Sequence, residues 1–180
     1  MSGGPEAVSA GRDAAQEIAE RLWLAAKLQV LTPRRAFSMN DAVDAALFLT
    51  DKMFKQQGTR VRCVLADGLP QADASMGEVE QSLVNVLMNA CEAAAGGEVL
   101  VETRLAPGNR VEVRVTDTGA GIEPQAQEAV FEPFFSTRGR LGLGLTTARD
   151  LFRRAGGEVR MESRPGAGTS VFMALPASAR

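Results

Sequence analysis

Residues 80–90 read EQSLVNVLMNA, and they carry the clearest structural signal in the chain. Its apolar residues recur at spacings of three and four, which is the pattern of an amphipathic helix. The pattern predicts a helix over about 77–95 that is ended by Gly96-Gly97. Asn85 and Asn89 are four residues apart, so their amides project from one face of that helix, about one turn apart. Amide oxygens are hard ligands that suit Mg²⁺ beside phosphates, although an isolated pair is more often solvated or caps a backbone.

A second helix is expected upstream, over about 41–57, because apolar residues recur there with the same spacing. Ser38 or Asn40 can cap its start, and Gly58 stands where a C-terminal cap belongs. A short strand is expected over 61–65, followed by a turn. The N-terminal part of the domain therefore alternates between helix and strand.

Apolar and polar residues alternate downstream of the 77–95 helix. Strands over 99–105 and 110–116 flank a Pro-Gly-Asn turn, which predicts a hairpin. A helix is expected over about 145–154, and strands over 158–163 and 169–175 then form a second hairpin. Helices mixed with hairpin strands predict an α+β fold, a two-layer sandwich in which helices cover one face of a mixed, mostly antiparallel sheet.

The region before this domain has a different composition. Residues 1–11 are small and polar and are expected to form a disordered leader. Residues 12–31 have apolar positions that step by three and four, typical of a bundle seam, and Thr32-Pro33 ends this N-terminal helix. The helix would either pack on its own domain or form half of a dimerisation bundle. The expected organisation is a helical segment over 12–36, a domain over 37–176 and a tail over 177–180.

Composition narrows the chemistry. The 180 residues include no histidine and two cysteines, and the net charge is −2 with a pI near 5.3. The lack of histidine excludes an internal imidazole base and the commonest ligand of transition metals. Two cysteines predict reduced thiols in a cytoplasmic protein. The slight acidity argues against a nucleic-acid partner. No apolar run reaches the roughly 18–20 residues that span a bilayer, so no membrane contact by this chain is expected, although a longer parent protein could be membrane-anchored.

Three further motifs follow the 77–95 helix. The sequence DTGAG at 117–121 follows a strand and places a carboxylate beside two glycines, where a ligand can approach the backbone. The sequence FEPFFSTR at 131–138 brackets a proline with aromatic residues that could bury the base of a loop. The sequence RLGLGLT at 140–146 opens a helix, whose N-terminal amides favour an anion. Taken singly, these motifs fit a turn, a buried corner and a helix start as well as they fit a site.

Taken together and in this order, the motifs resemble the ATP-binding catalytic domain of bacterial sensor histidine kinases, a branch of the GHKL superfamily. The stretch at 80–90 resembles the N box of the family, 117–121 its G1 box, 131–135 its F box, 141–145 its G2 box and 156–169 its closing hairpin. The resemblance covers about 37–176. It implies the GHKL, or Bergerat, ATP-binding fold, with ATP and Mg²⁺ as cofactors.

The resemblance also implies a role for each matching residue. Asn89 would be the Mg²⁺ ligand, Asn85 would orient phosphates or water, and Asp117 would accept a hydrogen bond from the adenine amino group. Thr169 would lie near the adenine, through water, and a lid over 136–141 would hinge on the F-box phenylalanines. The implied nucleotide-binding residues are Asn89, Asp117, Gly119, Gly121, Phe131, Phe134, Thr137, Arg140, Gly142, Leu143, Gly144 and Thr169, and the implied catalytic residues are Asn85, Asn89 and Arg138.

Asn85 also separates subclasses, since hydrolytic relatives such as gyrase carry a glutamate general base at that place. An amide cannot accept a proton at neutral pH, which favours phosphoryl transfer over hydrolysis. The lid is short, with three residues between Arg138 and Gly142. Arg140 stands where the fuller G2 pattern has its first glycine, and either arginine could neutralise phosphate charge.

The expected function is that of the catalytic module of a two-component sensor histidine kinase. It would transfer the γ-phosphoryl group of ATP to a histidine outside this chain, because the chain contains none. A response regulator or phosphoacceptor protein would be the partner, and the N-terminal helix would make a homodimer. Two alternatives stay open. One is a degenerate binding or phosphorelay module that does not use ATP, and the other is an anti-sigma-type serine kinase.

Overall fold

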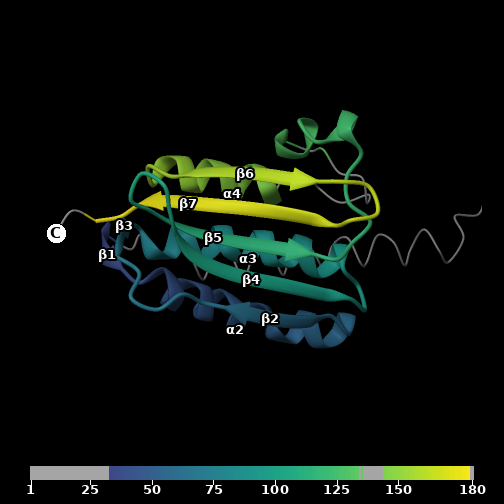
Figure 1. Cartoon of the computed structure of the whole chain (residues 1–180), viewed down its shortest axis with the longest axis horizontal. Helices are drawn as coiled ribbons and strands as arrows, with labels where there is room; N and C mark the ends of the chain where they lie inside the picture. The colour runs from purple at the N-terminus through teal and green to yellow at the C-terminus, as the bar shows by residue number, and fades with distance from the viewer. Residues whose placement is uncertain (1–32, 134, 136–143, 179–180) are drawn as a thin grey trace, which may run out of the picture.

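The computed structural model describes residues 33–133, 135 and 144–178. A five-stranded sheet runs through it in the order β2-β4-β5-β7-β6, and three helices lie on one face of that sheet (Figure 1). The strands of this sheet are β2 (Arg60–Val64), β4 (Glu98–Ala106), β5 (Arg110–Asp117), β6 (Glu158–Ser163) and β7 (Thr169–Pro176). The helices are α2 (Met39–Gln57), α3 (Met76–Ala93) and α4 (Gly144–Arg154), with short 3₁₀ turns η1 (Pro124–Ala126) and η2 (Ala129–Phe131).

The sheet confirms the predicted two-layer α+β architecture. Three of its four strand pairs are antiparallel, namely β4–β5, β5–β7 and β6–β7. The pair β2–β4 is parallel, because α3 carries the chain back across the sheet between these two strands. Helix α3 packs against both α2 and α4, so it is the central helix of the layer.

A second sheet of two short strands was not predicted. Strand β1 (Arg35–Phe37) pairs antiparallel with β3 (Ala72–Ala74), and each strand has three residues. Three residues are too few to show alternation in a sequence. The C-terminal end of the chain joins this sheet, since Ala177 forms a bridge with Ala72. The small sheet thus includes Arg35 and Ala177, which lie just outside the predicted range of 37–176.

The ends of α2 follow from its flanking residues. Ser38 caps the start, and its hydroxyl accepts a hydrogen bond from the Asp41 amide at 3.4 Å. Gly58 ends the helix in the left-handed conformation, with φ of +63°. Asn40 has a different task, since its side chain donates to the Ala66 carbonyl at 3.0 Å and accepts from the Thr103 hydroxyl at 2.8 Å. It therefore ties the first turn of α2 to β4 and to the loop after β2.

The core lies between the sheet and the helices. Alternate residues of β4 and β5 point into it, and those of α3 that face the sheet meet them there. Each such side chain, when fully buried, contributes roughly 1.5–3 kcal/mol to the free energy of unfolding. The fully buried members from these elements include Val79, Leu83, Val86, Leu87, Val99, Val101 and Val111.

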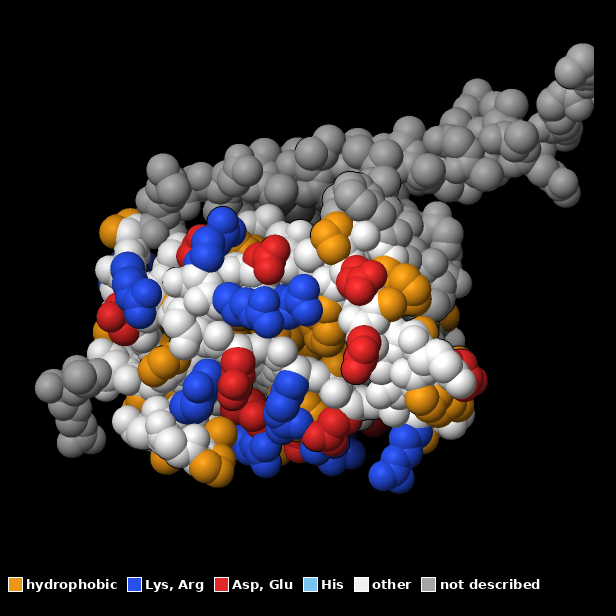
Figure 2. All heavy atoms as spheres, turned by 90° about the horizontal axis from the view of Figure 1, so that it is seen from above, with side chains coloured by type: hydrophobic (Ala, Val, Ile, Leu, Met, Phe, Trp, Pro, Cys, Tyr) orange, Lys and Arg blue, Asp and Glu red, His pale blue; other side chains and the backbone are white. Residues whose placement is uncertain are grey.

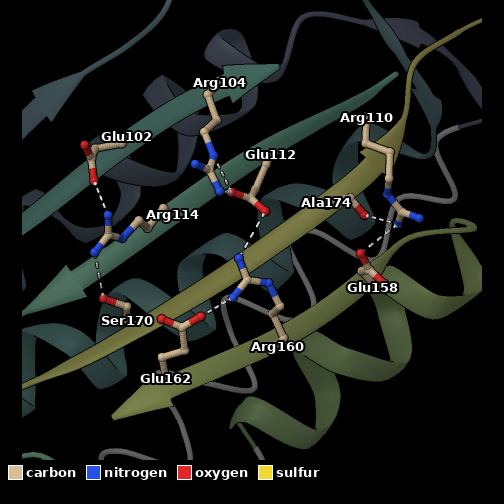
Figure 3. Close-up of polar contacts among 10 residues, drawn as sticks. All are labelled: Glu102, Arg104, Arg110, Glu112, Arg114, Glu158, Arg160, Glu162, Ser170 and Ala174. Atoms are coloured by element: carbon tan, nitrogen blue, oxygen red, sulfur yellow. Dashed lines mark hydrogen bonds and ion pairs between the residues drawn. The ribbon is translucent and has the colours of Figure 1, made fainter. Parts of the chain in front are cut away.

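The opposite face of the sheet carries charged side chains in alternating rows (Figure 3). Glu112 is 5% exposed, and it forms ion pairs with Arg104 at 2.6 Å and Arg160 at 3.7 Å. The guanidinium groups of Arg160 and Arg114 lie over the ring of Phe172, 3.5 and 5.3 Å from its centroid. Ion pairs and cation–π contacts therefore link the side chains of this outer face to one another, and none of the helices that the structure describes packs on it.

The surface seen from above mixes acidic and basic side chains, without a large field of one sign (Figure 2). Within the described residues, no helix is both long enough and apolar enough to cross a membrane.

Candidate functional site

Asp117 is the last residue of β5, on the face of the sheet that the helices cover. It is 6% exposed, and its Oδ1 accepts a hydrogen bond from the Gly119 amide at 2.8 Å. Thr169, the first residue of β7, is its register partner on the neighbouring strand. Side chains paired in this way point to the same face, with Cβ atoms about 4.5–5.5 Å apart. The structure therefore brings together two predicted site residues that are far apart in the sequence.

The glycines around Asp117 let backbone segments pack very closely. A Cβ added at Gly119 would lie 2.5 Å from the carbonyl oxygen of Ala93, the last residue of α3. Gly121 has φ of +73°, and a Cβ there would lie 2.0 Å from the Arg164 carbonyl oxygen. These two glycines thus hold the 117–121 turn against both the end of α3 and the turn between β6 and β7.

Asn85 and Asn89 lie on α3, and both side chains are half-buried. Ser82, one turn earlier, faces α4, since its hydroxyl lies 3.5 Å from the Ala148 carbonyl oxygen. Ala93 is one turn after Asn89, and it is the residue that the 117–121 turn touches. Asn85, Asn89 and Ala93 therefore follow one another along α3, and the last of them contacts the turn that begins at Asp117. This order allows the two asparagines and Asp117 to belong to one site.

Ser163 joins the Asp117 rung from the other side. It is the register partner of Thr169, and the two hydroxyl oxygens are 2.9 Å apart. Its oxygen also accepts from the Ile122 amide at 2.9 Å and lies 3.0 Å from the Gly168 carbonyl oxygen. Ser163, Thr169 and Asp117 thus form one rung across β6, β7 and β5. Ser163 was not among the predicted site residues, because its contacts with Ile122 join residues 41 positions apart.

Gln127 links the segment after the 117–121 turn to the end of β6. Its side-chain amide donates to the carbonyl oxygens of Ile122 and Ser163, both at 2.9 Å. A cavity of about 420 Å³ lies beside it, and Gly168 belongs to its lining. Ser163 also lines this cavity, whereas Asp117 does not. The cavity therefore lies at the Ser163 end of the rung.

Phe131, at the end of η2, is held by the start of α4. Its carbonyl oxygen accepts from the Thr146 hydroxyl at 3.0 Å and from Arg149 Nη2 at 2.9 Å. The Arg149 guanidinium also lies 5.1 Å from the centroid of the Phe131 ring. We call this set the Phe131 clamp. Gly144, a predicted site residue, is the buried first residue of the same helix. The clamp residues Thr146 and Arg149 were not predicted, although their spacing of three places them on one helix face.

Six predicted site residues lie outside the described residues, as do the N-terminal helix expected over 12–31 and the lid expected over 136–141. They are Phe134, Thr137, Arg138, Arg140, Gly142 and Leu143. Within the described part of the chain, no group of three or more Asp, Glu, Cys or His side chains is placed to hold a metal ion. A site for Mg²⁺ on these residues would therefore depend on Asn89 together with oxygens of a bound ligand.

Comparison with known proteins agrees with this arrangement. Residues 77–179 match the family described as histidine kinase-, DNA gyrase B-, and HSP90-like ATPase. Sensor histidine kinase ZraS of Salmonella typhi is 30% identical over 148 residues, which are 81% of this chain and 32% of that protein. Histidine protein kinase DivJ of Caulobacter vibrioides is 35% identical over 150 residues, 79% of this chain and 25% of that protein.

Solved structures give the same result. Full-length ShkA in complex with AMPPNP has a TM-score of 0.76 at 25% identity, over 99% of this chain and 40% of that chain. A mycobacterial sensor histidine kinase, MprB, has a TM-score of 0.71 at 24% identity, over 82% of this chain and all of that chain, and it shows the shared fold. This chain spans about a third or less of the length of the two curated relatives. The chain therefore belongs to the histidine kinase-, DNA gyrase B- and HSP90-like ATPase family, and it corresponds to the ATP-binding catalytic domain of the sensor histidine kinases.

Proposed function

We propose that this chain binds Mg-ATP and transfers its γ-phosphoryl group to a histidine on another polypeptide or on another segment of a longer parent protein. The observation that carries the proposal is the buried Asp117 carboxylate, aligned with Thr169 and packed beside the α3 end that follows Asn89. A buried carboxylate at the end of a strand can recognise an amino group, and the amides on α3 suit the phosphate end of the same ligand.

The turn after β5 would bind the adenine of ATP, and α3 would bind its phosphates. Asp117 accepts a hydrogen bond from the exocyclic amino group of adenine, while the 117–121 turn approaches the ring with its backbone. Asn89 would hold Mg²⁺ through its amide oxygen, and Mg²⁺ would supply charge neutralisation for the phosphates. The half-buried position of Asn89 leaves part of its amide accessible to a ligand.

Phosphoryl transfer rather than hydrolysis follows from Asn85. Its amide cannot take a proton from water at neutral pH, so water in this position is not activated. An imidazole nitrogen of the acceptor needs no such base, because its lone pair is available in the neutral ring. A new N–P bond forms as the bond between the γ-phosphorus and the bridging oxygen breaks, and ADP leaves with the electron pair of that bond.

The partners are part of the proposal. A response regulator would receive the phosphoryl group from the histidine, and the residues over 12–31 would contribute to a homodimer. Cytoplasmic ATP and a cytoplasmic regulator place this domain in the cytoplasm.

Incubation with ATP labelled at the γ-phosphate tests the activity, with the histidine-bearing segment of a related sensor kinase supplied as acceptor. We expect label on the acceptor that is stable in base and lost in acid, as a phosphoramidate is, and no label on this chain. Asn89→Ala should abolish transfer. Labelling of serine on this chain, or equal transfer by wild type and Asn89→Ala, would refute the proposal.

A further inference from the structure

Ile122 directly follows the 117–121 turn, and side chains hold both of its backbone polar groups. The Ile122 amide donates to the Ser163 hydroxyl at 2.9 Å, and the Ile122 carbonyl oxygen accepts from Gln127 Nε2 at 2.9 Å. Gln127 Nε2 also donates to the carbonyl oxygen of Ser163, the last residue of β6, at 2.9 Å. One side-chain amide therefore joins the end of the turn to the end of β6.

The two partners of Gln127 fix the orientation of its side-chain amide. Both are backbone carbonyl oxygens, which can only accept a hydrogen bond. The side chain must therefore present its NH₂ group to them, with one hydrogen for each oxygen. An ionised glutamate has nearly the same shape but no hydrogen to donate, so Gln127→Glu removes both bonds and places a carboxylate against two acceptors.

The connection between β6 and β7 also contacts the 117–121 turn. The Gly166 amide donates to the Ala120 carbonyl oxygen at 2.6 Å. Gly121 lies so close to the Arg164 carbonyl oxygen that a Cβ at Gly121 would overlap it. A cavity of about 420 Å³ lies beside the end of β6, so on that side hydrogen bonds rather than packing hold the turn in place. The position of the turn therefore depends on its bonds to the end of β6.

We propose that Gln127 is a positioning residue of the nucleotide site, which prepares the 117–121 turn for the purine by tying Ile122 to the end of β6. Gln127 acts through the backbone of Ile122 and not on the nucleotide itself. A turn that is free to move must be ordered when the ligand binds, and this cost lowers the affinity. The inference rests on the proposed function, in which this turn binds the adenine of ATP.

Calorimetry on the full chain, with Mg-ATP and Mg-ADP as separate ligands, tests the inference with Gln127→Glu. We expect the Kd of both nucleotides to rise about tenfold, the scale of one hydrogen bond. The factor should be the same for both, because ATP and ADP share the purine. In phosphoryl transfer to the histidine-bearing segment of a related sensor kinase, the KM for ATP should rise by a similar factor while kcat stays unchanged, as expected for a loss of uniform binding.

Two further variants separate positioning from added charge and from loss of structure. Gln125→Glu is the matched control, because Gln125 lies exposed in η1 and gains the same negative charge; it should bind both nucleotides as wild type does. Gln127→Met removes both donors without adding a charge, and it should raise the KM for ATP in the same way. Loss of folded protein would instead lower the amount of active enzyme, and therefore kcat, at an unchanged KM.

Each result decides the inference. An unchanged Kd and KM in both Gln127 variants overturns the inference and leaves the proposed function standing. A larger loss for ATP than for ADP in Gln127→Glu, repeated in Gln125→Glu, would mean that the added charge repels the phosphates, and this also overturns it. Wild type that binds neither nucleotide overturns the proposed function and the inference with it. If Gln127→Glu does not fold by circular dichroism, the KM of Gln127→Met decides alone.

Discussion

Gly168 is the position where the structure makes its sharpest stability prediction. Its φ is +78°, and a Cβ there would lie 1.9 Å from the carbonyl oxygen of Asp117. Gly166 lies in the same turn with φ of +75°, but a Cβ there would meet nothing within 4 Å. Alanine at either position is strained by the positive φ. Only alanine at Gly168 would also displace the backbone of β5, because its Cβ would overlap the Asp117 carbonyl oxygen.

The two variants therefore separate strain from close approach. The positive φ costs about 1–2 kcal/mol for a residue with a Cβ. Displacing a packed backbone atom adds about 1–3 kcal/mol, by analogy with overpacked cores. We expect Gly168→Ala to lose about 2–5 kcal/mol of unfolding free energy and Gly166→Ala about 1–2 kcal/mol.

Urea denaturation of both variants, followed by circular dichroism, measures the difference. Thermal unfolding gives a second readout, because at this chain length each kcal/mol of lost unfolding free energy lowers the Tm by about 2–4 °C. Gly168→Ala should also weaken nucleotide binding, because the atom that must move belongs to Asp117, whereas Gly166→Ala should bind as wild type does. Equal destabilisation by the two substitutions would show that the packing of Gly168 against Asp117 is not a constraint.

Three further predictions concern other parts of the domain. Glu112→Ala should lower the free energy of unfolding by about 1–3 kcal/mol, because Arg104 and Arg160 lose their buried partner. The control Glu162→Ala removes an exposed ion pair and should lower it by less than about 1 kcal/mol. Urea denaturation compares the two variants. Arg149→Met should release Phe131 and weaken Mg-ATP binding measured by calorimetry, and Arg153→Met, an exposed change on the same helix, should not. Burial raises the pKa of Glu80 above its ordinary value of 4.5, so its ionised form destabilises the fold. Glu80→Gln should therefore be more stable than wild type at pH 7, with the gain disappearing as the pH falls below 4.5; a gain that persists at low pH would contradict this cause.

The sequence was sufficient for elements whose signals are local. The 3.6-residue period of α3 and the alternation of β4 and β5 are visible within short windows, and each is enforced by burial of one face. The strand-end position of Asp117 followed from the same alternation, since the carboxylate comes directly after Val115 and Thr116. The caps of α2 at Ser38 and Gly58 were predicted because capping chemistry depends on one residue.

Features that depend on distant partners could not be predicted in the same way. The parallel pairing of β2 with β4 depends on how α3 packs, and β2 itself is exposed along its length. The hydroxyl rung needs Ser163 to meet Ile122, and the Phe131 clamp needs Arg149 to reach across from α4. Such contacts are set by tertiary packing, so a single residue in the sequence carries no sign of them.

Calorimetric titration of Mg-ATP into wild type, Asp117→Ala and Asp67→Ala tests directly whether the Asp117 carboxylate binds the nucleotide. Asp67 lies exposed in the turn after β2 and serves as the matched control for loss of a carboxylate. We predict saturable one-site binding by wild type and Asp67→Ala, and no binding by a folded Asp117→Ala. Saturable binding that survives in Asp117→Ala with unchanged affinity, or no binding by wild type at millimolar nucleotide, would show that Asp117 does not form a nucleotide site.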